Sequence, residues 1–139
     1  MAKIAVIYWS GTGNTEAMAG FVAEGAKDAG AEAELFQVSD FDLATLDAYD
    51  AFALGCPAMG SEELEYDEFQ PFWDEAKGQL GSKKVALFGS YEWADGEWMD
   101  TWRADAEDAG VNPVDTLICY DAPDAEAEEA CRSLGAKLA

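Results

Sequence analysis

The sequence predicts a doubly wound α/β domain, with about five parallel strands and helices on both faces of the sheet. Apolar, strand-like runs recur five times, helix-like stretches lie between them, and a Gly- and Thr-rich loop joins the first run directly to a helix. Strands that alternate with helices form βαβ units, whose strands are parallel. The chain has 139 residues, half of them hydrophobic, so we expect one domain over residues 1–139.

The elements follow in order along the chain. We expect strands at residues 4–9, 33–38, 51–56, 85–89 and 114–120, and helices at residues 15–29, near 69–80, 98–109 and 124–138. Gly30 and Gly110 each follow an Asp-Ala pair, where a glycine typically ends a helix. The acidic linker 40–50 is expected to hold a short or irregular helix. Three tryptophans at helical positions are expected to pack in the core: Trp73, Trp98 and Trp102.

Composition excludes several functions. The formal charge of −21 would repel nucleic acid and anionic membranes. It is compatible with solubility, with a salty cytoplasm, or with steering toward basic partner proteins. The absence of His removes the commonest general base. Three cysteines without a CxxC pair argue against disulfides and zinc, and favour a reducing cytoplasm. No apolar run approaches the ~20 residues of a membrane span.

The loop after the first strand reads Ser10-Gly11-Thr12-Gly13-Asn14-Thr15. Its hydroxyls, amide and backbone N–H groups can converge on a phosphate at the N-terminus of the following helix, whose first amides have no intrahelical partner. The loop contains no Lys and does not match a Walker A sequence, and Glu16 replaces the third glycine of GxGxxG. A monophosphate therefore fits better than a triphosphate or a dinucleotide.

Two further loops follow strands that end at the same edge of such a sheet, where ligands bind. Met59 and Gly60 lie in the loop after the third strand, which reads either as a structural turn or as a cover for a flat ligand. Trp93 lies in the loop that begins at Gly89 and is a candidate stacking surface. Together, the three loops predict a planar heteroaromatic ligand that carries one phosphate, and FMN is the obvious match.

Three segments, residues 8–16, 55–65 and 85–91, closely resemble the short-chain flavodoxins of anaerobic bacteria, in order and at the right spacing. The resemblance covers essentially the whole chain. It implies the strand order 2-1-3-4-5 and non-covalently bound FMN. It also implies a low-potential one-electron carrier that cycles mainly between semiquinone and hydroquinone and shuttles electrons between redox enzymes. We expect a monomer that docks transiently on basic redox partner proteins, with no catalytic residue and no metal ligand.

The resemblance also implies roles for particular residues. Met59 and Trp93 would flank the flavin ring, the Gly60 carbonyl would accept a hydrogen bond from the reduced flavin, and Glu62 would contact flavin N3. Asp121 would approach the pyrimidine edge. The full cofactor-binding set is Ser10, Gly11, Thr12, Gly13, Asn14, Thr15, Ala58, Met59, Gly60, Ser61, Glu62, Ser90, Tyr91, Glu92, Trp93 and Asp121. Glu92 and Ala94 replace two glycines that the family often has.

Two alternatives remain at this point. One is an FMN-dependent quinone or flavin reductase on the same fold. The other is a receiver-type signalling domain, which needs an Asp at the end of the third strand and a Lys after the fifth; Cys56 and residues 119–121 stand there instead. Cys56 is expected to be a packed small hydrophobe, and Cys131 to face the core from the last helix.

Overall fold

The protein is described by a computed structural model of residues 2–10, 13–58, 64–65, 67–81, 83–91, 96–120 and 122–139. Within these residues five parallel strands form one sheet in the order β2-β1-β3-β4-β5. The strands are β1 (Lys3–Tyr8), β2 (Glu32–Gln37), β3 (Ala51–Gly55), β4 (Lys84–Tyr91) and β5 (Asp115–Tyr120). The helices are α1 (Asn14–Asp28), α2 (Phe69–Ala76), α3 (Glu97–Asp108) and α4 (Ala125–Leu138). The predicted fold class and strand order are confirmed.

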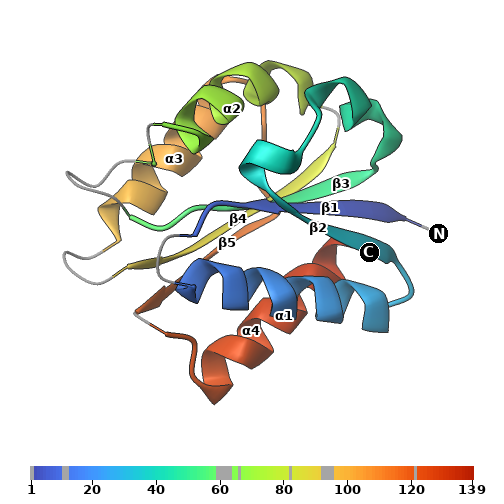
Figure 1. Cartoon of the computed structure of the whole chain (residues 1–139), viewed down its shortest axis with the longest axis vertical. Helices are drawn as coiled ribbons and strands as arrows, with labels where there is room; N and C mark the ends of the chain where they lie inside the picture. Colours follow the sequence, from blue (N-terminus) through green and yellow to red (C-terminus); the bar gives the residue numbers. More distant parts are fainter. Residues whose placement is uncertain are drawn as a thin grey trace.

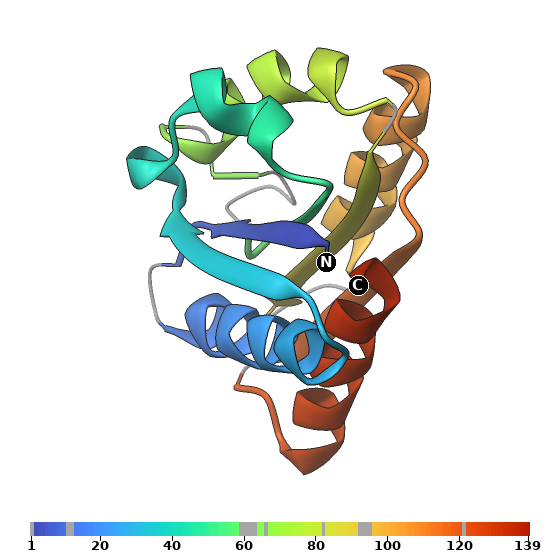
Figure 2. The same cartoon turned by 90° about the vertical axis from the view of Figure 1, so that its right-hand side faces the viewer.

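The helices form two layers around the sheet. Helices α1 and α4 lie side by side on one face, and α2 and α3 cover the other (Figure 1; Figure 2). Because all strands are parallel, their carboxyl ends meet at one edge of the sheet, on the left in Figure 1. We call this the carboxyl edge. Each of the four helices begins near it, and therefore directs its N-terminus toward it.

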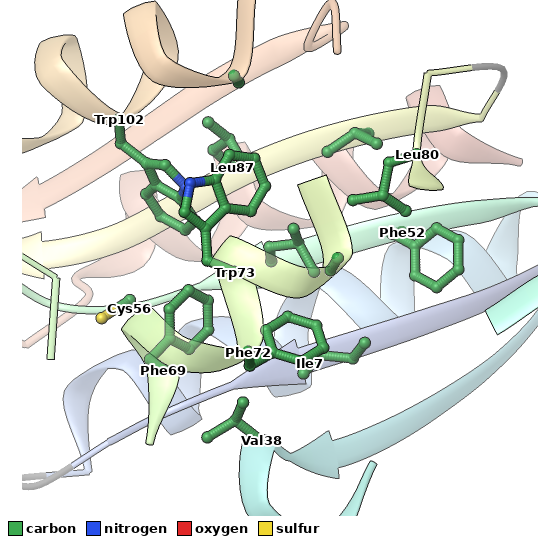
Figure 3. Close-up of a cluster of buried hydrophobic side chains, with 14 of the residues drawn as sticks. Ile7, Val38, Phe52, Cys56, Phe69, Phe72, Trp73, Leu80, Leu87 and Trp102 are labelled. Atoms are coloured by element: carbon green, nitrogen blue, oxygen red, sulfur yellow. The ribbon is translucent and has the colours of Figure 1, made fainter. Parts of the chain in front are cut away.

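Apolar side chains fill both spaces between sheet and helices. The face toward α1 and α4 is packed with small and aliphatic residues, such as Val6, Met18 and Leu134. The face toward α2 and α3 is aromatic, and Figure 3 shows Phe69, Trp73 and Trp102 gathered above the sheet. Trp73, Trp98 and Trp102 are all at most 2% exposed, which confirms their predicted place in the core.

A polar contact links the two helices on the aromatic face. The indole Nε1 of Trp73 on α2 donates to Oδ2 of Asp105 on α3 at 2.7 Å, and Lys77 Nζ lies 3.1 Å from the same oxygen. The carboxylate raises the pKa of Lys77 by accepting this hydrogen bond. The ring of Trp73 also meets that of Trp102 edge to face, with centroids 5.8 Å apart. These contacts fix α2 against α3.

The predicted elements are found within one or two residues of their expected ends, except that α2 ends at Ala76, before the predicted end near residue 80. Ser90 and Tyr91 were predicted to lie in a loop after a strand at 85–89, and this was wrong: β4 continues through both. Ser90 and Tyr91 pair with Cys119 and Tyr120 of β5, which extends the strand beyond its apolar run.

The predicted helix ends and the predicted linker are found in the structure. Gly30 and Gly110 end α1 and α3 with φ values of +96° and +86°. A 3-10 helix at Val38–Asp40 leads into the acidic linker, which contains a second one at Leu43–Ala48. Residues 69–80 divide into α2 and a 3-10 turn at Lys77–Gln79. Among the described residues, no helix has both the length and the apolar character needed to cross a membrane.

Candidate cofactor site at the carboxyl edge

The first part of the site is the turn that joins β1 to α1. Gly13 precedes the helix with φ +95°, a conformation that side chains disfavour, and a Cβ there would meet no atom within 4 Å. Its amide donates to Ser10 Oγ at 3.0 Å, and its carbonyl accepts from Ala17 N. Gly13 has no side chain to cap the helix. The first turn of α1 therefore begins beside open space, in the arrangement that suits an anion.

Two buried hydroxyls meet behind this turn. Thr15 on α1 and Ser90 on β4 are 1% and 4% exposed, and Thr15 Oγ1 lies 3.3 Å from Ser90 Oγ. The residues are 75 positions apart in the sequence. Each hydroxyl has one donor and two acceptor positions, so the pair can bond to each other and still donate to a ligand oxygen. The structure thus brings Ser90 to the phosphate-type loop, a contact that the sequence analysis did not identify.

The loop after β3 is held against the end of β4. Cys56 N donates to Phe88 O at 3.1 Å, and Ala58 N donates to Ser90 O at 3.0 Å. The Cys56 carbonyl accepts the indole N–H of Trp98 at 3.2 Å. Gly89 makes this approach possible, because a Cβ there would lie well inside 3.0 Å of the Cys56 carbonyl oxygen. Ala58 is therefore fixed next to Ser90 at the carboxyl edge.

Glu65 accepts hydrogen bonds at the start of α2, a role that was not predicted from the sequence. Its side chain is 6% exposed. Oε1 accepts from the amides of Glu68 and Phe69 at 2.7 and 3.0 Å, and Oε2 accepts from Asp67 N at 2.9 Å. A buried carboxylate thereby satisfies amides at the start of α2. No local pattern distinguishes Glu65 from the other acids of residues 62–68 in the sequence.

Cys56 is a structural residue, as predicted. It is fully buried, and its Sγ accepts the amide of Glu65 at 3.3 Å. Burial raises the pKa of the Cys56 thiol to about 12, so the reactive thiolate is suppressed at neutral pH. Cys131 is also fully buried, and burial raises the pKa of its thiol to about 12 as well. Both cysteines behave as small apolar residues with inert thiols.

Aromatic rings lie together where β4 and β5 end. The Tyr91 ring packs against Trp98 and Tyr120, with centroids 5.8 and 5.5 Å apart. Trp98 is buried, Tyr91 is half-buried, and Tyr120 is 64% exposed. The group therefore runs from the core to the surface at the carboxyl edge.

The loops at the carboxyl edge contain acidic residues and no basic ones. Residues 9–13, 56–68, 92–96 and 121–124 contain no Lys or Arg. Lys3, Lys83 and Lys84 lie at the opposite ends of the strands, and Lys27, Lys77, Arg103, Arg132 and Lys137 lie midway along the helices or near their ends. Near the end of β1, burial raises the pKa of Tyr8, and the carboxylates of Glu16 and Asp40 raise it further. An anion here must be held by neutral donors.

Of the predicted site residues, Ser10, Gly13, Asn14, Thr15, Ala58, Ser90 and Tyr91 are described, and all lie at the carboxyl edge. The others lie outside the described residues: Gly11, Thr12, Met59, Gly60, Ser61, Glu62, Glu92, Trp93 and Asp121. The predicted roles that rest on this second group stay predictions.

The fold and the edge define a class: a flavodoxin-like α/β protein with a candidate anion site, neutral and lined by hydroxyls, at the switch between β1 and β3. Comparison with known proteins is more specific. The flavodoxin family model matches residues 6–135. The chain is 46% identical to the flavodoxin of Megasphaera elsdenii over 132 residues, 95% of each chain. It is 45% identical to that of Clostridium beijerinckii, over 96% of this chain and 97% of the relative.

Solved structures agree. The solution structure of two-electron reduced Megasphaera elsdenii flavodoxin matches with a TM-score of 0.88 and 44% identity, over 96% of this chain and 98% of that one. Oxidised flavodoxin 1 from Bacillus cereus matches with a TM-score of 0.84 and 31% identity, over 99% and 97%. The chain belongs to the flavodoxin family. It is an electron carrier that works with redox proteins, and is not an enzyme, which sets aside the reductase and receiver alternatives.

Flavodoxins bind FMN, and the described groups are compatible with its phosphate. The donors at the start of α1 are hydroxyls and backbone amides, and Gly13 leaves room where a side chain would stand. Neutral hydrogen-bond donors at a helix N-terminus suffice for a phosphate monoester. When bound, FMN supplies the redox centre, and the protein supplies its binding and electrostatic surroundings.

Proposed function

We propose that this flavodoxin, acting as one FMN-binding domain over residues 1–139, carries single electrons at low potential. In this proposal Ser10, Thr15 and Ser90, together with the backbone of the first loop, hold the phosphate. The observation that carries it is the buried Thr15–Ser90 hydroxyl pair at the start of α1. A hydroxyl pair at the N-terminus of a helix favours an anion without placing a cation beside the flavin.

Charge supports the low-potential part of the proposal. A carboxylate about 8 Å from an anionic reduced flavin, at an effective dielectric constant of about 20, raises its energy by roughly 2 kcal/mol before screening. For a one-electron couple that is at most about 90 mV. Because the loops of the carboxyl edge contain no Lys or Arg, no basic side chain in them offsets this repulsion. We therefore propose that the protein works mainly at the lower of the two one-electron potentials of FMN.

The same charge distribution supports basic redox partners. Because the loops of the carboxyl edge contain acids and no bases, a basic partner surface attracts this edge of the molecule. The charge of −21 also opposes self-association, so we propose a monomer. The three cysteines are buried and are thiols rather than disulfides, which suits a reducing cytoplasm, and we propose the cytoplasm as the location of the protein.

The binding proposal is tested with Ser90→Ala and Thr15→Ala. Hydrogen bonds to a charged group are worth about 1.5–3 kcal/mol, so each substitution should raise the dissociation constant of FMN by roughly 10- to 100-fold. Riboflavin, which lacks the phosphate, should lose much less affinity. The matched controls are Ser133→Ala and Thr101→Ala, both at exposed helical positions. Equal losses for FMN and riboflavin would contradict the phosphate role of the pair.

The electrostatic proposal is tested by potentiometry of the FMN-loaded protein at rising salt. Screening should raise the lower one-electron potential by tens of millivolts, because it weakens the repulsion between the acids and the reduced flavin. Electron transfer to basic redox proteins should slow over the same range. A potential that is unchanged or falls with salt would show that the acidic edge does not tune the flavin.

A further inference from the structure

Exposed apolar side chains gather along β5. Among the described residues, the large hydrophobic side chains with substantial exposure are Leu35, Val114, Ile118 and Tyr120, and all but Leu35 lie on β5 or next to it. Ile118 and Tyr120 alternate along the strand and therefore share one face of the sheet. Val114, four residues before Ile118, continues the same row. The row ends at the carboxyl edge.

A groove runs along this strand. Its volume is about 380 Å³, and it lies between β5 and the first half of α4. On the side of β5 it is lined by consecutive residues that point to alternate faces, Leu117 toward α4 and Ile118 and Tyr120 toward the other face, and on the side of α4 by Ala122, Asp124 and Glu126. Among the described residues that line it, none is Lys or Arg. The groove is therefore apolar on one side and acidic on the other.

The backbone edge of β5 is open in the described part of the chain. β5 is the last strand of the sheet and pairs only with β4. Proteins usually guard such an edge with charged side chains, because unpaired backbone groups invite another strand. The other edge strand, β2, carries exposed Glu32 and Glu34, and Glu34 pairs with Lys3. On β5 the exposed residues are Ile118 and Tyr120, and the charged side chain of the strand, Asp115, lies at its amino end and pairs with Lys137.

Charge decides which occupant fits the groove. A second copy of this chain also has a net charge of −21 and would be repelled by Asp124 and Glu126, so a homodimer is disfavoured. A segment with Lys or Arg would pair with these carboxylates, and its cations could also stack on the exposed ring of Tyr120. Since Tyr120 packs against Tyr91, such a segment would lie next to the candidate cofactor site.

We propose that the β5 edge is a docking strand for a basic, extended segment of a redox partner, which adds to the sheet beside β5. Backbone hydrogen bonds would supply the pairing, Ile118 and Tyr120 the apolar contact, and Asp124 and Glu126 the charge selectivity. The inference rests on the proposed function, because it gives the basic partner a particular surface.

The test uses FMN-loaded, isotope-labelled protein and a nine-residue peptide of alternating Lys and Val with blocked ends. NMR titration should shift the amides of β5 and of the first turn of α4, and should slow hydrogen exchange in β5. Ile118→Lys should weaken binding by about tenfold or more, since it removes apolar contact and guards the edge with a cation. Tyr120→Lys provides a second variant at a more exposed position.

Leu35→Lys is the matched control, because it makes the same change at an exposed position of the other edge strand. It should weaken binding by less than about twofold, as long-range charge alone would. A peptide N-methylated at alternate residues should lose the β5 shifts. Shifts spread over other acidic surfaces, or equal losses for the β5 and Leu35 variants, would overturn the inference. The basic-partner proposal would still stand in that case if electron transfer to basic proteins slowed with salt.

Discussion

Two glycines five residues apart in α1 should respond in opposite directions to the same substitution. Gly20 has open space around it, and a Cβ there would meet nothing within 4 Å. Gly25 faces α4, and its Cβ would lie well inside 3.0 Å of the backbone of Arg132. Gly135 on α4 is equally restricted by the Val22 carbonyl of α1. Helices α1 and α4 therefore touch through their backbones at Gly25 and Gly135.

The magnitudes follow from these contacts. Replacing a helical glycine by Ala contributes about 0.8–1 kcal/mol where the site has room, so Gly20→Ala should stabilise the protein by nearly that amount. At Gly25 the neighbour is backbone and cannot rotate away, so α1 and α4 must separate by roughly 1 Å. A gap of that size forfeits a quarter to a half of each contact across it, and overpacking typically costs about 1–3 kcal/mol. Gly25→Ala should therefore be destabilising by about 1–3 kcal/mol.

Urea unfolding followed by far-ultraviolet circular dichroism measures both variants, with FMN held at one saturating concentration, because bound ligand adds to apparent stability. In thermal unfolding under the same conditions, the midpoint should rise by about 3 °C for Gly20→Ala and fall by about 4–10 °C for Gly25→Ala in a chain of this length. If Gly25→Ala were as stable as Gly20→Ala, the close backbone contact between α1 and α4 would not exist in solution.

Three further predictions concern polar and titrating groups. Glu65→Gln should lower the free energy of unfolding in urea by about 1–3 kcal/mol, because the side-chain amide of Gln cannot accept from all three backbone N–H groups. The control Glu68→Gln, at an exposed carboxylate, should change it by less than about 0.5 kcal/mol. Burial raises the pKa of Cys131 in the folded protein from 9.0 to about 12, so the stability that its neutral thiol contributes is complete below pH 9 and is lost as the pH rises toward 12. Over that range Cys131→Ala should therefore lose less stability than the wild type, and equal pH dependence of the free energy of unfolding in the two proteins would contradict this. Asp115 has a pKa lowered mainly by the hydrogen bond from Lys137, so Asp115→Asn should cost less than about 1 kcal/mol at pH 7, and the difference should vanish as the pH falls below the ordinary value of 3.8.

The part of the candidate site that was predictable from the sequence is the part formed by one continuous segment. Ser10, Gly13 and Thr15 are contiguous with a strand and a helix, so their place at the carboxyl edge follows from the topology. The contact between Thr15 and Ser90 was not predictable, because the two residues are 75 positions apart in the sequence and meet only through the order of β1, β3 and β4 in the sheet. Ser90 looked like a loop residue because a hydroxyl ended the apolar run.

The acidic residue Glu65 illustrates a second limit. In the sequence it is one of several carboxylates near the third strand, and nothing in its neighbourhood marks it as buried. In the fold it is enclosed by the start of α2, where its two oxygens accept three amide hydrogens. Burial depends on which elements converge on a residue, and this is a property of the assembled chain.

By itself, the sequence determined the α/β class, the ends of α1 and α3 at Gly30 and Gly110, the neutral phosphate-type loop and the family. These follow from local periodicity, turn chemistry and charge, which act within a few residues. Only the tertiary structure decided that β4 extends through Tyr91, that α1 and α4 touch at Gly25 and Gly135, and that β5, an edge strand in the described part of the chain, exposes Ile118 and Tyr120. Each of these depends on close approach between segments distant in the sequence, where the space left for one atom is set by a backbone elsewhere.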